Sequence, residues 1–188
     1  MNETIKTILN RRSTRVFAEG NIKEEDIKAI VEAGIYSPSA MNQQPWHFAV
    51  VQNKELLDEL SFESKETAKK SDNDYINKLA HNENFHIFYN APVGIVVSVK
   101  EDAYEGEVDC AAATENMLLA AESLDIGSCW IGYISFLFSM DPEKSKKYAQ
   151  RLGIPEGYKP LHAVALGQKK NNNAKAPARK ENTVTYVK

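Results

Sequence analysis

Helical spacing of apolar residues marks the first part of the chain. Apolar side chains recur at intervals of three and four from Ile5 to Leu9 and again from Ile27 to Val31, which predicts two amphipathic helices. Asn21 is the expected cap of the second helix, because Glu24 follows three residues later as in a capping box. This helix should end near Gly34, just before a Ser-Pro-Ser turn.

The rest of the chain alternates between strand and helix patterns. Residues 46–51 and 161–166 have the composition of strands, and the β-branched run over residues 92–99 predicts a strand buried on both faces. Residues 108–124 are rich in alanine and apolar around most of their circumference, as expected of a central buried helix. A further helix is expected over residues 142–153, opened by an Asp-Pro pair.

Weaker patterns occupy the remaining stretches. The leucines of residues 56–60 predict one helix, but residues 61–84 are polar and read as an excursion to which no element is assigned. Residues 124–132 (LDIGSCWIG) contain the glycines of a turn that follows the alanine-rich helix. The tail over residues 168–180 is basic and polar, whereas residues 183–187 (TVTYV) are β-prone.

Composition limits the class of protein. The 188 residues show no repeat or linker, so a single domain spanning residues 1–188 is expected. The net charge of −3 provides no global basic field for nucleic acid or an anionic membrane. The N-terminus lacks a signal-peptide core and no apolar run reaches membrane-spanning length, so we expect a cytoplasmic protein. Cys110 and Cys129 are the only cysteines, which argues against a disulfide framework or a zinc knuckle.

Two stretches near the N-terminus have residues suited to binding a polar ligand. Residues 11–15 (RRSTR) place three arginines and a serine at the end of a helix, and such groups bind phosphate. The alternative is a solvated helix end, where cations suit the dipole. Residues 37–46 (SPSAMNQQPW) combine small and amide side chains, which match the edge of a heterocycle. They are equally suited to a capped loop whose tryptophan fills the core.

Two further stretches are less distinctive. The glycines of residues 124–132 would let backbone approach a planar ligand, or would simply end a helix. Residues 176–180 (APARK) are either part of a site or a basic surface tail.

Cys129 is expected to be a small packed residue rather than a reactive thiol. The four histidines lack paired ligand spacing, so no metal site is predicted.

Taken in order, the motifs RRSTRVF, SPSAMNQQPW, DIGSCWIG and PARK resemble those of the nitroreductase family, and they extend over nearly the whole chain. The resemblance implies an α+β fold, a three-layer α/β/α sandwich with a mainly antiparallel central sheet flanked by helices. It also implies a homodimer with two FMN sites at the interface, in which the C-terminal segment extends to the dimer partner.

The resemblance assigns roles to particular residues. Arg11, Ser13 and Arg179 would meet the FMN phosphate and ribityl chain, while Arg15 would lie near the pyrimidine edge of the flavin. Residues 38–44 of the other subunit would line the flavin, and backbone N–H groups of residues 130–132 would approach its N5 and O4. The full set of implied FMN contacts is Arg11, Arg12, Ser13, Arg15, Pro38, Ser39, Ala40, Asn42, Gln44, Trp130, Ile131, Gly132 and Arg179.

The implied function is an NAD(P)H-dependent FMN oxidoreductase. Hydride would pass from NADH or NADPH through the flavin to a small oxidised substrate, such as a nitroaromatic or a quinone, in a ping-pong mechanism with no protein nucleophile. Alternatives within the family are ene-reductase, reductive dehalogenase or flavin-modifying activity. From other classes, a flavin-binding storage or sensing protein without turnover and a domain without a cofactor also remain open.

Overall fold

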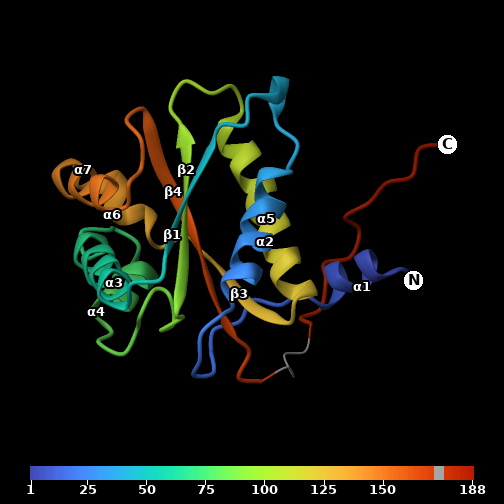
Figure 1. The fold of residues 1–188 in the computed structure, drawn as a ribbon, viewed down its shortest axis with the longest axis horizontal. Coiled ribbons are helices and arrows are strands. Elements are labelled where there is room, and N and C mark those ends of the chain that lie inside the picture. Colours follow the sequence, from blue (N-terminus) through green and yellow to red (C-terminus); the bar gives the residue numbers. More distant parts are fainter. Residues whose placement is uncertain (172–175) are drawn as a thin grey trace.

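An antiparallel sheet forms the centre of the molecule. The computed structural model describes residues 1–171 and 176–188, and within them the sheet has four strands in the order β1-β2-β4-β3. All neighbouring strands are antiparallel (Figure 1). The strands are β1 (Trp46–Val51), β2 (Val93–Lys100), β3 (Ile126–Ile131) and β4 (Tyr158–Gln168).

Helices cover both faces of this sheet. Figure 1 shows α2 and α5 on one side, and α3, α6 and α7 on the other, with α4 against α3. The helices are α1 (Glu3–Asn10), α2 (Glu24–Ile35), α3 (Lys54–Ala68), α4 (Asp74–His81), α5 (Gly106–Ser123), α6 (Ser135–Met140) and α7 (Pro142–Arg151), with a short 3-10 turn η1 (Ala40–Asn42). The expected three-layer α/β/α sandwich is therefore confirmed.

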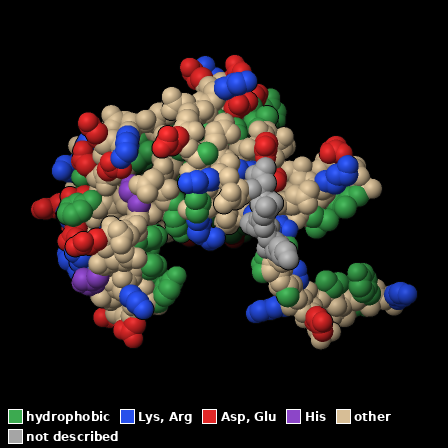
Figure 2. Space-filling model, turned by 90° about the horizontal axis from the view of Figure 1, so that it is seen from below, with side chains coloured by type: hydrophobic (Ala, Val, Ile, Leu, Met, Phe, Trp, Pro, Cys, Tyr) green, Lys and Arg blue, Asp and Glu red, His purple; other side chains and the backbone are tan. Residues whose placement is uncertain are grey.

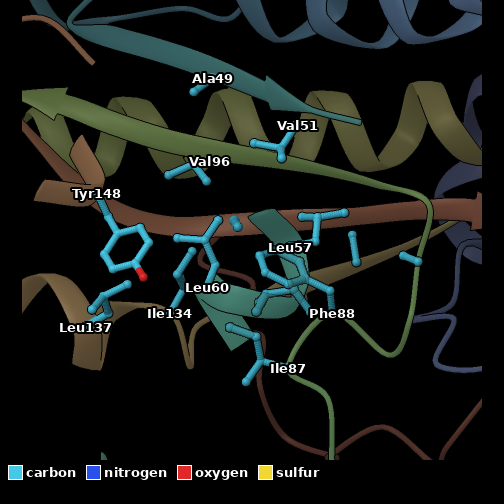
Figure 3. Close-up of a cluster of buried hydrophobic side chains, with 14 of the residues drawn as sticks. Ala49, Val51, Leu57, Leu60, Ile87, Phe88, Val96, Ile134, Leu137 and Tyr148 are labelled. Atoms are coloured by element: carbon cyan, nitrogen blue, oxygen red, sulfur yellow. The ribbon is translucent and has the colours of Figure 1, made fainter. Parts of the chain in front are cut away.

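Each face of the sheet carries its own apolar core. On β2, Ile95 and Val97 face α2 and α5, while Val96 faces the opposite helices, and all three are fully buried. Figure 3 shows Leu57 and Leu60 of α3 pointing toward the sheet in this second cluster. The prediction that the β-branched run is buried on both faces is confirmed. No helix in residues 1–171 and 176–188 is long and apolar enough to span a membrane.

Two local predictions need correction. Helix α2 begins after Lys23 rather than after an Asn21 cap, and no side chain caps it. The stretch expected as a turn, residues 124–132, contains strand β3, because Ile126, Cys129 and Ile131 are buried and the backbone pairs with β4. Glycine and serine weaken the strand signal there, so only pairing in the folded sheet reveals it.

The segment that sequence left unassigned, residues 61–84, is largely helical. It contains the end of α3 and all of α4, whose first turn is capped by the Asn73 side chain accepting from the Tyr75 and Ile76 N–H groups. Helix α7 begins as predicted, with Asp141 accepting from the Lys144 N–H. At the C-terminus, residues 183–187 pair with no strand of the described chain, and residues 172–175 of the predicted tail lie outside it.

Two glycines that face each other across the sheet give the N-terminal segment its place. Gly127 of β3 is the register partner of Gly167 of β4. A Cβ on Gly127 would lie 2.8 Å from a methyl carbon of Thr14, and one on Gly167 would lie 2.6 Å from the ring of Phe17. The Thr14 N–H donates to the Ser128 carbonyl at 2.8 Å. Residues 13–17 can therefore follow the sheet closely only because both positions lack a side chain.

We predict that Gly127→Ala lowers the free energy of unfolding by about 1–3 kcal/mol, because the new methyl group overlaps Thr14. Thr14→Ala in the same chain should restore most of that loss, since it removes the Thr14 methyl carbon and hydroxyl oxygen, which lie 2.8 and 3.0 Å from the new Cβ. Gly132→Ala is the matched control: within the described residues its Cβ would meet no atom within 4 Å. Denaturant unfolding of all four variants measures this, and additive effects of Gly127→Ala and Thr14→Ala would contradict the account.

Candidate functional site

Three polar side chains of the N-terminal segment gather beside β3. Residues 11–15 leave the end of α1 and run parallel to β3, with a bridge between Ser13 and Ser128. Burial raises the pKa of the Cys129 thiol, while Arg15, Arg11 and a hydrogen bond from Ser13 oppose the rise. All three groups thus lie close enough to Cys129 to act on its charge. The structure brings together Arg11, Ser13 and Arg15 as a single cationic strip.

Each arginine in this strip has a different partner. Arg11 Nε lies 3.7 Å from a carboxylate oxygen of Glu115 on α5. The guanidinium of Arg15 lies 5.9 Å from the ring centroid of Tyr89, within cation–π range. Burial disfavours the charged form of Arg15, yet its pKa is raised, because Tyr89 hydrogen-bonds it and Cys129 lies nearby. Arg15 therefore stays positively charged, and each of the two side chains has a partner that orients it.

Arg12 has a local structural role. One of its terminal nitrogens donates to the carbonyls of Leu9 and Arg11, at 2.8 and 2.6 Å, and so caps the end of α1. Arg12 also lines a cavity of about 660 Å³ that extends to Lys169, whose ammonium pairs with Glu122 and Asp125. Arg12 therefore has a structural role that requires no ligand, and its implied FMN contact stays a prediction.

The amide-rich loop is strained and firmly anchored. Met41, Asn42 and Gln44 have positive φ values of 52°, 54° and 48°, which cost L-residues roughly 1–2 kcal/mol each. The Ala40 N–H donates to both carboxylate oxygens of the buried Asp109, each at 3.1 Å. The Gln44 N–H donates to the Ser39 hydroxyl at 3.0 Å. Such strain, held by specific contacts, is typical of ligand-binding loops.

Within one chain, this loop and the arginines lie apart. The loop is anchored at the first turn of α5 through Asp109, whereas Arg11 pairs with Glu115 farther along that helix and Ser13 bridges to β3. Pro38, Ser39, Ala40, Asn42 and Gln44 are therefore not brought beside Arg11 in the single chain. Arg179 is exposed in the C-terminal segment and has no described contact with the strip. A site built from all of these residues requires a second chain.

The end of β3 is held by a tilted pair of aromatic rings. The ring of Trp130 lies 4.3 Å from that of the buried His162 on β4, and His162 Nε2 lies 2.7 Å from the Thr114 hydroxyl. Because the Thr114 hydroxyl donates to the Cys110 carbonyl, its oxygen accepts from His162 Nε2. Burial lowers the pKa of His162 to about 4, so the ring stays neutral. This pair fixes the backbone that leads into Ile131 and Gly132.

Metal or thiol chemistry finds no support among the described residues. No group of three or more His, Cys, Asp or Glu side chains is placed to hold a metal ion there. Burial raises the pKa of Cys110 to about 12, and Cys129 is only 2% exposed within the apolar core. The geometry of Cys129 is that of the packed residue expected from its sequence setting.

Sequence reasoning missed three residues that position the site. Asp109 anchors the strained loop, Glu115 pairs with Arg11, and Tyr89 pairs with Arg15. Asp109 lies in the first turn of an apolar helix, where a buried acid is a signal that sequence could have offered. Glu115 and Tyr89 are distant in sequence from the arginines, so only the folded chain shows the pairing.

We predict that His162 makes the protein less stable in mild acid. Its folded pKa, about 4, lies below the ordinary 6.5, so between these values the unfolded chain binds the proton more readily. The contribution is complete above about pH 6.5 and is lost as the pH falls toward 4, amounting to about 2 kcal/mol near pH 5.

Urea unfolding at pH 7.5 and near pH 5 measures the effect. His162→Gln should lose less stability than the wild type over this interval, because it has no ring to protonate. His81→Gln is the matched control, since His81 is exposed on α4. An equal loss in wild type and His162→Gln would contradict the prediction.

Comparison with known proteins agrees with this geometry. The Nitroreductase family profile matches residues 8–168. A Bacteroides fragilis nitroreductase solved with bound FMN is 39% identical, with a TM-score of 0.90 and 100% of each chain covered. A Desulfitobacterium hafniense nitroreductase with bound FMN is 34% identical, again with a TM-score of 0.90 and full coverage. A Vibrio harveyi NADPH-flavin oxidoreductase is 30% identical over 92% of this chain and 68% of that protein. This chain belongs to the nitroreductase family.

Proposed function

We propose that this protein is an NAD(P)H-dependent FMN oxidoreductase that reduces a small oxidised substrate. The observation that carries the proposal is the strip of Arg11, Ser13 and Arg15 laid along β3. Two similar structures contain FMN, and a similar Vibrio protein is named for NADPH-dependent flavin chemistry. Family membership and the cationic strip support the same cofactor independently.

The residues present fit FMN. A phosphate dianion needs cationic donors, and Arg11 meets this need because, among the described residues, its one ion pair is a long 3.7 Å contact with Glu115. A planar ring needs backbone without side chains, and Gly132 has open space around its Cβ position in the described chain. Ser13 is exposed on the strip and can donate to a sugar-like hydroxyl chain.

The roles of this chain's residues follow from their placement. Bound FMN supplies the two-electron chemistry, which the protein orients and tunes. Arg11 and Ser13, with Arg179, would hold the phosphate and ribityl chain. Arg15 would place a positive charge at the pyrimidine end, where reduction adds negative charge. The backbone N–H groups of Ile131 and Gly132 would donate to the ring without competing as acids.

We extend the proposal to the substrates. NADH or NADPH would stack on the exposed face of the bound flavin and leave before the oxidant takes the same place, so the two would use one site in turn, giving ping-pong kinetics. Nitroaromatics and quinones are suitable oxidants, since they accept hydride or electrons from a reduced ring. The second candidate is a flavin-binding sensor without turnover, which the arginine strip would serve equally well. The two candidates differ in whether nicotinamide can reach one face of the bound flavin, which only the oxidoreductase requires.

We predict that purified protein incubated with FMN shows flavin absorbance bands that bleach within seconds when NADH or NADPH is added anaerobically. Arg11→Ala/Arg179→Ala should weaken FMN binding at least tenfold, because two phosphate contacts are lost. Lys70→Ala/Lys146→Ala removes the same charge from exposed positions in the opposite layer and is the control. Bands that persist would favour the sensor, and unchanged FMN affinity in the arginine variant would overturn the phosphate assignment.

The same proposal requires two chains. None of the residues of α1 is buried in the single chain, and Ile5, Ile8 and Leu9 are 44%, 45% and 55% exposed along one stripe. Figure 2 shows α1 and the C-terminal residues projecting from the body with apolar side chains on their surfaces. Val184 and Tyr186 of this segment are 65% and 85% exposed. Apolar surface of this extent is typical of an interface.

The sheet edge offers a matching surface. Strand β1 lies at one edge of the described sheet, beside an apolar groove of about 490 Å³ that includes Ile27, Val31 and Ile35 of α2 and Val50 of β1. An edge strand has unpaired backbone groups that a β-prone segment can bond. We propose that residues 183–187 of a partner chain occupy this edge, in a homodimer that also carries the loop over residues 38–44 to the partner's arginine strip.

We predict that Val184→Ser/Tyr186→Ser weakens the dimer at least tenfold, because two apolar side chains leave the interface. Sedimentation velocity over a range of protein concentrations measures the dissociation. Phe62→Ser is the control, since Phe62 is 60% exposed on α3, in the opposite layer. Wild-type protein that retains FMN as a monomer would refute the shared site.

A further inference from the structure

Tyr89 is the aromatic partner of Arg15 in the described chain. The Arg15 guanidinium carbon lies 5.9 Å from the centroid of the Tyr89 ring, within cation–π range. Arg15 is exposed and long, so without a partner its side chain would sample many rotamers. A ring beneath the guanidinium restricts the positions that this side chain can take.

The backbone at Tyr89 is strained. Tyr89 and Asn90 have φ values of 55° and 57°, in the left-handed region that residues with a Cβ rarely occupy. Two successive residues in this conformation turn the chain sharply between the end of α4 and β2. Strain of this kind persists only where surrounding contacts hold it, and it is concentrated at functional positions.

Contacts from α3 and from within the turn hold this segment. The His86 ring accepts from the Phe88 N–H at 3.1 Å, and the Ile87 N–H donates to the buried Ser61 hydroxyl at 3.0 Å. Lys65 of α3 donates to the Phe85 carbonyl at 2.9 Å. The Phe85 ring packs edge-on against Tyr89, with centroids 6.0 Å apart. The turn is thus fixed from α3 and from its own side chains.

We propose that Tyr89 is a positioning residue that holds Arg15 over the proposed flavin site and thereby sets the reduction potential of bound FMN. The inference rests on the proposed function, since it assigns Arg15 to the pyrimidine end of FMN. A guanidinium fixed near that end favours the reduced, more negative form of the cofactor. A guanidinium that moves freely in solvent is screened and favours it less.

The test is the reduction potential of FMN in the full-length holoprotein. Arg15→Ala should reduce the preference for reduced over oxidised FMN about 3- to 10-fold, which lowers a two-electron potential by about 15–30 mV. Tyr89→Leu should lower it by a similar amount, and Tyr89→Phe by less because the ring remains. Adding Tyr89→Leu to Arg15→Ala should cause no further change. All three side chains at position 89 carry a Cβ, so the backbone strain is matched.

Tyr133→Phe is the control, because it removes a hydroxyl that donates to the Ile76 carbonyl at 3.0 Å in the same aromatic cluster. It should leave the potential unchanged. A potential that falls in Arg15→Ala but not in Tyr89→Leu overturns the proposal, and so does an equal fall in Tyr133→Phe. Failure of the proposed function shows separately, as wild-type protein that takes up no FMN. The contact is then tested by a double-mutant cycle on unfolding of the FMN-free chain, where additive effects overturn it.

Discussion

The close approach of the N-terminal segment to the sheet is the constraint on which the site depends. Gly127 and Gly167 face each other on β3 and β4, and Thr14 and Phe17 occupy the space that side chains there would fill. The hydrogen bond from the Thr14 N–H to the Ser128 carbonyl then fixes the register of the segment. Successive residues of an extended segment point to opposite sides, so with Thr14 seated on the sheet the alternate positions 11, 13 and 15 share the other side. The cationic strip is a consequence of that register.

A second feature of the fold is that two of its strained segments lie where a ligand would bind. Left-handed residues occur in the loop around Met41 and Gln44 and in the turn at Tyr89, and each is held by contacts from a helix. Asp109 of α5 accepts from the first, and Ser61 and Lys65 of α3 hold the second. The energetic cost of these conformations is therefore offset by packing in the rigid layers of the sandwich. A loop held in this way changes little on binding, which lowers the entropic cost of taking up a cofactor.

Sequence patterns predicted the parts of the fold whose signal is local. The β-branched run of β2 and the apolar face of α5 identify their elements without reference to any neighbour, and the four motifs identified the family. Strand β3 was not predicted, because Gly127 and Ser128 are poor strand formers and its conformation depends on pairing with β4. Helix α4 was not predicted, because its eight residues are mostly polar and give little apolar periodicity. The partners of the arginines were not predicted for a different reason. Glu115 lies about a hundred positions from Arg11, and Tyr89 lies about seventy from Arg15, and no periodicity links residues so far apart in sequence.

The choice of partners explains how an acidic chain can present a cationic strip. Lys169 is 13% exposed and faces two carboxylates at 3.1 and 3.0 Å, so its charge is compensated within the protein. One terminal nitrogen of Arg12 donates to the carbonyls of Leu9 and Arg11 at the end of α1, while its buried Nε has no partner among the described residues. Arg11 keeps a longer contact of 3.7 Å with a half-exposed carboxylate, which orients it and leaves donors available. Arg15 has an aromatic ring as its partner, and a ring attracts a cation through its quadrupole without cancelling the charge. The cation proposed for the electron-accepting end of the site is thus the one that the fold positions without neutralising it.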